Sequence, residues 1–332
     1  MIAISDKLRH QVMKLAEQYE KPEFITDDPV QFPRRFGYKC SQEIVGFIAA
    51  WLAYGNRKAI LSTCEKLCKE MERLTPYMYI KNMGWRKYID SEEPLYRFFK
   101  EKDFADLCRA LKEIYDNNED MEEALSKNYT RTMGATDYLD ALISLFPGVK
   151  GIPQDSKSAC KRLNMFLRWM CRRNSPVDLG IWSFIPQSSL LIPLDTHVAT
   201  VGRQLGLITG KGDSMNTVLE LTTNCRNVYP LDPCKCDYAL FGYGVNNKTN
   251  KVMKATVESV LLNTSSRSVE IFAEILNAIT SCENENELRA CMKLIQERFP
   301  VSFNSCFVYG FGSTHMWVTE PGRKERLIFV EF

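Results

Sequence analysis

The stretch LLIPLDTHVATVGRQLGL, residues 190–207, changes character at a single acidic residue. An apolar run ends at Leu194 and an amphipathic pattern begins at Thr196, which predicts an extended segment followed by a helix. Asp195 stands at the junction between the two. An aspartate in this position can cap the helix by accepting backbone hydrogen bonds, or it can take part in chemistry. The two roles are compatible, because a helix N-terminus stabilises a carboxylate.

Upstream of this junction, most of the chain follows a helical period. Apolar residues recur every three or four positions in segments that are separated by short polar or glycine-containing connections. The predicted helices are 41–55, 56–74, 103–116, 120–129, 135–146 and 157–173. We therefore expect a mainly α fold, with residues 1–250 forming one helical domain.

The pattern changes after residue 250. Residues 251–267 are rich in polar side chains and are interpreted as a linker. Two helical segments follow, and then three segments in which β-branched and aromatic residues alternate with polar ones. The last two of these segments are joined by a turn at Pro321-Gly322. Residues 268–332 are therefore predicted to form a small α+β domain with a three-stranded antiparallel meander, whose role the sequence does not indicate.

Composition excludes several classes of protein. The net charge is +2, with 45% hydrophobic and 25% charged residues, as in ordinary soluble globular proteins. We expect no membrane partner and no secretory signal, since no run approaches the roughly 18 apolar residues of a membrane helix. Twelve cysteines and three histidines are scattered without metal-ligand spacing. Free thiols, no metal, no cofactor and a cytoplasmic location are therefore predicted.

A second informative stretch is KSACKRLNMFLRWMCRR, residues 157–173. On a helix, Lys161, Asn164, Arg168 and Arg172 share one face, opposite an apolar face, and no acid lies among them. Such a face is either simply solvated or occupied by an anion, because the cations otherwise repel one another. The phosphate backbone of DNA is the natural anion.

Taken together, the two stretches resemble the helix-hairpin-helix DNA glycosylase superfamily, which includes endonuclease III and the 8-oxoguanine glycosylases. In that superfamily a lysine lies just inside the second helix of a hairpin, and an aspartate in a V-D-x-H segment opens a later helix. Lys161 and the segment Leu194-Asp195-Thr196-His197 match these features. IVGFIAAWLAYGNRKAI (44–60) resembles the early helix–turn–helix of the superfamily, and DYALFGYGV (237–245) resembles its late helix. The overall pattern is also similar to a group of bacterial conserved hypothetical proteins.

The resemblance implies a DNA repair glycosylase with AP-lyase activity that excises an oxidised base similar to 8-oxoguanine. Its partner would be double-stranded DNA with a damaged base or an abasic site, so the protein would be nucleoid-associated when bound. Lys161 would attack C1′ and form a Schiff base, and Asp195 would assist. The residues expected to contact DNA are Lys157, Arg162, Arg168, Arg172, Asn56 and Arg57. The aromatic residues expected to line a pocket for the extruded base are Tyr54, Trp169 and Tyr243.

The hairpin departs from the superfamily pattern G-x-G-x-K-[ST]. Lys157 and Ala159 stand where the two glycines belong, so the hairpin is either altered or moved to FPGVKG, residues 146–151. Lys157 is a second candidate for the reactive lysine. The longer spacing from Lys161 to Asp195 predicts an insertion at 175–189. Three alternatives stay open: a DNA-binding protein without catalysis, a monofunctional glycosylase that uses water, and a helical protein-interaction module.

Overall fold

Helices build most of the part of the chain that the structure describes. A computed structural model describes residues 5–246, 302–309, 313–319 and 326–331. The chain consists of two compact units, residues 1–247 and 248–332. The prediction of a mainly α fold is confirmed.

The α-helices of the first unit are α1 (Asp6–Tyr19), α2 (Lys39–Leu52), α3 (Arg57–Met71), α4 (Pro76–Lys81), α5 (Glu101–Asn117), α6 (Met121–Asn128), α7 (Asp137–Ser144), α8 (Lys161–Cys171), α9 (Thr196–Gln204), α10 (Met215–Arg226) and α11 (Lys235–Asn246). Helices α2, α3, α5, α6, α7 and α8 of the first unit correspond to the six predicted segments, whereas α1, α4 and α10 were not predicted. The 3-10 helices are η1 (Pro22–Asp27), η2 (Pro29–Gln31), η3 (Pro33–Arg35), η4 (Arg86–Tyr88) and η5 (Gln187–Ser189). A short antiparallel pair, β1 (Pro94–Tyr96) and β2 (Phe99–Lys100), precedes α5.

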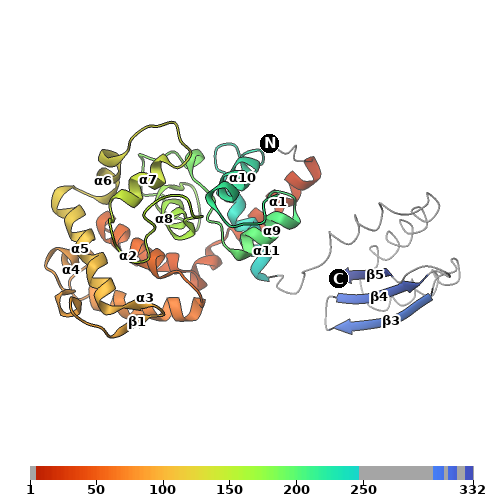
Figure 1. The fold of residues 1–332 in the computed structure, drawn as a ribbon, viewed down its shortest axis with the longest axis horizontal. Helices are drawn as coiled ribbons and strands as arrows, with labels where there is room; N and C mark the ends of the chain where they lie inside the picture. The colour runs from red at the N-terminus through yellow and green to blue at the C-terminus, as the bar shows by residue number, and fades with distance from the viewer. Residues whose placement is uncertain (1–4, 247–301, 310–312, 320–325, 332) are drawn as a thin grey trace. The chain divides into compact units, whose positions relative to one another are not determined.

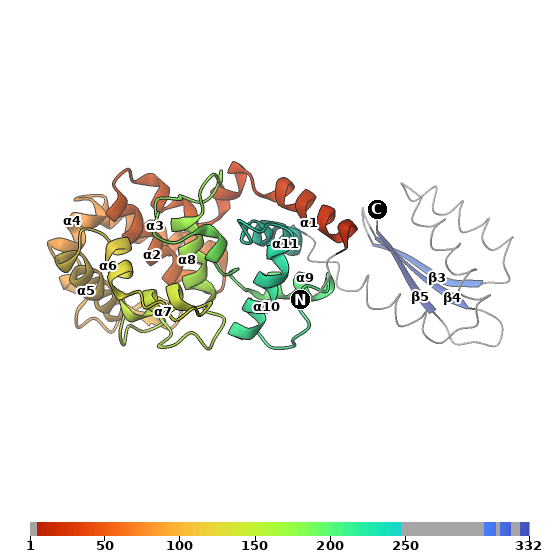
Figure 2. The same cartoon turned by 90° about the horizontal axis from the view of Figure 1, so that it is seen from above.

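The helices of the first unit form two groups. Figures 1 and 2 both show α2 to α8 gathered together, with α1, α9, α10 and α11 beside them. In the first group α2 packs against α8, and in the second α11 packs against α1 and α9. No described helix has both the length and the apolar character needed to cross a bilayer.

Helix α8 is held by its apolar face. As the helical period predicts, Leu163, Phe166, Leu167 and Met170 are all buried. The ring of Phe166 meets the ring of Phe47 from α2 edge-on, with centroids 5.1 Å apart. This packing fixes the axis of α8 and so determines where its polar residues lie.

The described residues of the second unit are three strands, β3 (Ser302–Tyr309), β4 (Ser313–Thr319) and β5 (Arg326–Glu331). They pair antiparallel in the order β3-β4-β5. The predicted linker at 251–267 and the two helical segments predicted after residue 268 lie outside the described residues. The α+β domain therefore stays a prediction.

Candidate functional site

Lys161 is the first residue of α8. The residue before it, Cys160, has a positive φ of 45°, so the chain turns abruptly into the helix there. The side chain of Lys161 is half-buried, and its Nζ lies 3.5 Å from the sulfur of Met165 one turn later. Among the described residues it forms no ion pair. This amine is therefore available to a ligand.

Asp195 is the N-cap of α9, as the sequence predicts. Its Oδ1 accepts hydrogen bonds from the backbone N–H groups of His197 and Val198, both at 2.9 Å. The other oxygen, Oδ2, accepts no hydrogen bond from any described residue. Capping thus fixes the carboxylate through one oxygen and leaves the second for another partner.

Asp237, on α11, links these two residues and was not predicted as a site residue. Burial raises its pKa to about 6. The charge of Arg168 opposes that rise, the charge of Asp195 adds to it, and the charge of Lys161 opposes it. Lys161 and Asp195 thus both act electrostatically on this buried carboxyl, which pairs directly with Arg168 of α8. In the sequence, Asp237 is the first residue of the segment 237–245, which resembles the late helix of the superfamily. An acid at the start of that segment was the available sign of a site residue.

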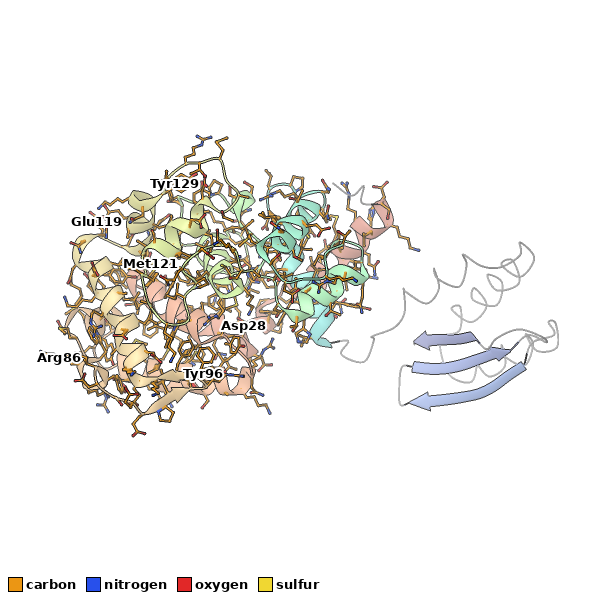
Figure 3. The ribbon with its side chains drawn as sticks, viewed as in Figure 1. Asp28, Arg86, Tyr96, Glu119, Met121 and Tyr129 are labelled. Carbon is orange, nitrogen blue, oxygen red and sulfur yellow. The ribbon has the colours of Figure 1, made fainter. Side chains whose placement is uncertain are left out.

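Asp28 is a second buried acid that was not predicted. It precedes η2, where its Oδ1 accepts a hydrogen bond from the N–H of Val30 at 3.0 Å. Burial raises its pKa, and the positive charges of Arg168, Arg57 and Lys161 oppose that rise. Figure 3 labels Asp28 near the border between the two groups of helices.

Arg57, a predicted DNA contact, lies at this site. Its guanidinium carbon is 5.3 Å from the centroid of the Phe241 ring, which in turn meets His197 edge-on at 6.1 Å. Asn56, also a predicted contact, is exposed, but its side chain caps α3 by accepting from the N–H of Ala59 at 3.2 Å. Of the two, only Arg57 has a positive charge that acts on the pKa of Asp28.

The predicted phosphate-binding face of α8 is wrong for Arg168 and Arg172. Both side chains are buried and bind acids from outside α8. Arg168 pairs with Asp237 and, at 3.2 Å, with Asp178. Arg172 pairs with Asp178 at 2.9 Å, and also with Glu20 at 2.5 Å and Asp232 at 2.8 Å. Helix α8 itself has no acid on this face, but acids from other segments pair with the two arginines. The arginines therefore join α8 to those segments.

Two further predicted DNA contacts have defined partners. The guanidinium of Arg162 donates to the carbonyl oxygens of Trp51 and Gly151, and its burial lowers its pKa. Arg162 therefore ties α8 to the end of α2, and its contact with DNA stays a prediction. Lys157 is fully exposed before the start of α8 and pairs with Asp155 at 2.9 Å.

The three predicted pocket aromatics lie in different surroundings. Trp169 is 0% exposed within the core, which corrects its interpretation as a pocket residue. Tyr54 is 48% exposed, with the guanidinium carbon of Arg97 5.0 Å from its ring centroid. Tyr243 is half-buried on α11. The structure thus does not bring these three side chains together in one pocket.

The segment FPGVKG lies between α7 and α8, where the alternative hairpin is predicted. Gly148 and Gly151 have φ angles of 71° and 82°, a conformation that glycine adopts without strain. A side chain at Gly148 would meet no atom within 4 Å, so this backbone is open on one side. The local geometry is that of two tight turns, ten residues before Lys161.

We name Lys161, Asp195, Asp237, Asp28, Arg57 and Arg168 the charged cluster. Arg168 of α8 pairs with Asp237 of α11, and the Phe241 ring of α11 contacts both Arg57 and His197 of α9. The cluster contains an amine without an ion pair among the described residues, a carboxylate with one oxygen that accepts no hydrogen bond from them, and a buried acid whose pKa is about 6. Such an arrangement suits nucleophilic or acid–base chemistry on a substrate. No group of acids, cysteines and histidines among the described residues is arranged to hold a metal ion.

Comparison with known proteins gives a family but no activity. Residues 253–328 match a model described as a domain of unknown function, DUF8466. No curated protein and no solved structure matches the chain. Residues 28–246, which include the whole charged cluster, match the model described as a protein of unknown function, DUF2400. The chain therefore belongs to the DUF2400 family.

Proposed function

We propose that the chain is a DNA glycosylase with AP-lyase activity and that Lys161 is its nucleophile. The observation that carries this proposal is the state of two side chains: Lys161 Nζ forms no ion pair with a described residue, and Asp195 Oδ2 accepts no hydrogen bond from one. The two residues lie 34 positions apart in the sequence, and the charge of each acts on the buried carboxyl of Asp237. The resemblance to the helix-hairpin-helix glycosylases independently selects the same lysine and the same aspartate.

The chemistry assigns one task to each group. The neutral amine of Lys161 attacks C1′ of the damaged nucleoside, and the bond from C1′ to the base breaks as the base leaves with a proton. Loss of the amine proton and ring opening give a Schiff base between Nζ and C1′, from which β-elimination breaks the C3′–O bond. Oδ2 of Asp195 accepts the proton of the amine or stabilises the cationic sugar.

Further features support the proposal. The tight turns of FPGVKG leave space around Gly148 for a phosphate to approach, although the N–H of Gly148 already donates to Gln154 Oε1 at 3.1 Å. Arg57 adds a positive charge at the charged cluster. The proposed partner is double-stranded DNA that carries an oxidised base or an abasic site, and the proposed location is the cytoplasm. Residues 268–332 would add a small α+β domain with a three-stranded meander.

A glycosylase that uses water at the same cluster is the second candidate. The free Oδ2 of Asp195 favours it, because a carboxylate oxygen without a hydrogen-bond partner can deprotonate a water molecule. In this case Lys161 would only bind a phosphate or stabilise the leaving base. The two candidates differ in whether a covalent adduct forms.

Borohydride trapping on duplex oligonucleotides separates the candidates. The duplexes carry 8-oxoguanine, an oxidised pyrimidine or an abasic site, and base release is measured in parallel. We expect wild type to form a covalent adduct, Lys161→Gln to form none, and Lys157→Gln to retain it as the matched control. Asp195→Asn should slow the reaction on the order of 100-fold.

Three results would separate the lyase from the water-using glycosylase and from a DNA-binding protein. Base release by Lys161→Gln with no adduct from any variant would select the water-using candidate. An undiminished adduct from Lys161→Gln would exclude Lys161 as the nucleophile. Neither adduct nor base release from wild type, with DNA binding intact, would contradict the glycosylase proposal and leave a DNA-binding protein.

A further inference from the structure

A cavity of about 520 Å³ lies away from the charged cluster. The connection from α6 to α7 forms one side of it, and residues near η5 and the last residue of α10 form the other. Figure 3 shows Tyr129, which lines this cavity, well separated from Asp28 of the charged cluster. The volume is in the range of cavities that bind small molecules.

Three aromatic rings form one wall. Tyr129 and Tyr138 stack with centroids 4.6 Å apart and planes 14° from parallel. The ring of Phe184 meets both edge-on, at 5.5 Å and 5.9 Å. Phe184 nevertheless remains 37% exposed, so part of this aromatic wall faces the solvent. The exposed part of the Phe184 ring, braced by the two tyrosines, is a surface on which a planar ring can stack.

Two arginines face the same cavity from different elements. Arg131 comes from the connection between α6 and α7, and its charge acts on the pKa of Tyr138. Arg226 ends α10, and its Nε donates to the carbonyl oxygen of Ser188 at 3.3 Å. Neither arginine forms an ion pair with any described residue.

The acid that lines the cavity is already engaged. Asp137 accepts hydrogen bonds from the backbone N–H of Thr132, at 2.9 Å, and from the hydroxyl of the same residue, and these bonds lower its pKa. It therefore shapes the α6–α7 connection and forms no ion pair with either arginine, but its carboxylate stays charged. The lining combines an aromatic wall with two cations and one anion, so the cations are in excess.

We propose that this cavity binds a nucleotide unit, with the base stacked on Phe184 and its neighbours and the phosphate held by Arg131 and Arg226. Stacking is open to every base, and a guanidinium matches the geometry of a phosphate. The unit comes either from a free mononucleotide or from a nucleotide of a single DNA strand. The inference does not rest on the proposed function, because no residue of the charged cluster lines the cavity.

Titration calorimetry on the full chain tests the inference. The probes are dGMP, deoxyguanosine, inorganic phosphate and a single-stranded oligodeoxyguanylate. We expect dGMP or the oligonucleotide to bind, and Arg131→Gln and Arg226→Gln each to weaken that binding about tenfold or more. Phe184→Ala should weaken it by a similar factor. Arg86→Gln, which changes an exposed arginine outside the cavity, should leave it unchanged.

The probes also identify the source of the nucleotide. Stronger binding of the oligonucleotide than of dGMP assigns the cavity to a DNA strand, and equal or weaker binding assigns it to a free mononucleotide. Binding of inorganic phosphate as strong as that of dGMP would overturn the inference, since the aromatic wall would then be unused. Absence of binding by dGMP and oligonucleotide alike, in a wild type that unfolds cooperatively, would overturn it as well.

Discussion

The two ends of α8 carry similar charges in very different surroundings. At its start, Lys161 is half-buried and has no ion-pair partner among the described residues. At its end, Arg172 is 2% exposed and pairs with Glu20, Asp178 and Asp232. A cation with several carboxylate partners is structural, whereas a cation beside acids that it does not pair with is available for chemistry. The helical face alone did not distinguish the two, because the acids come from other segments.

Breaking the structural end should have the largest effect. Arg172→Met removes the cation of Glu20 and Asp232 and one of the two cations of Asp178, so we expect a loss of about 3–5 kcal/mol in the free energy of unfolding. Chemical denaturation measures this loss. The control is Arg73→Met, because Arg73 is exposed and forms no ion pair with a described residue. A loss below about 1 kcal/mol would mean that Arg172 does not hold these segments together.

Glu43 sharpens the comparison, since it is a buried acid without a cation. It accepts hydrogen bonds from Trp182 Nε1 at 2.6 Å and from the Tyr115 hydroxyl and the Met121 N–H, both at 3.0 Å. Burial raises its pKa to about 7. In the folded state it therefore binds its proton more tightly than in the unfolded state, where its pKa is about 4.5.

This difference gives a dependence of stability on pH with a definite sign. The contribution of Glu43 is fully present below pH 4.5 and is lost as the pH rises to about 7. The stability of wild type minus that of Glu43→Gln should therefore fall by about 3 kcal/mol over that interval. Denaturation of both proteins at several pH values measures this difference. A difference that stays constant with pH would show that Glu43 titrates normally.

Asp237 should set the pH dependence of the chemistry. With its pKa at about 6, it becomes charged as the pH rises through that value. The charged form stabilises a cationic sugar, so the rate of trapping on an abasic duplex should rise about tenfold with a midpoint near pH 6. Asp237→Asn should remove this step. If the variant keeps the same midpoint, another group is responsible.

The smallest effect is expected on the stability of Lys161→Gln. The Nζ of Lys161 contacts only the sulfur of Met165 among the described residues, so the free energy of unfolding should change by less than about 1 kcal/mol. The same denaturation experiment as for Arg172 measures this change. A loss comparable to that of Arg172→Met would show that both ends of α8 are structural.

The sequence predicted the parts of the fold that depend on local periodicity. The helices around Phe47 and Phe166, and the cap at Asp195, follow from apolar spacing and from the preferences of helix starts. The burial of Arg168 and Arg172 did not follow, because their acids lie 6 to 152 positions away, outside the helix, and only the tertiary fold brings them near. For the same reason the sequence could not show that Asp237 pairs with Arg168.

The FPGVKG turn was one of two alternatives, and residue spacing alone could not choose between them. The positive φ angles of Gly148 and Gly151 show that this segment makes tight turns. Lys157, where the other alternative places a glycine, is an exposed residue before the helix. Glycine-free segments can still turn, as Cys160 does, so composition is an incomplete guide.

The most direct measurement is to locate the trapped adduct. Wild-type protein is reduced with borohydride on an abasic duplex, digested, and analysed by mass spectrometry for the lysine that carries the sugar fragment. The predicted result is modification of Lys161, the cation at the open end of α8. Modification of Lys157 instead, or of neither residue, would contradict the assignment of Lys161 as the nucleophile.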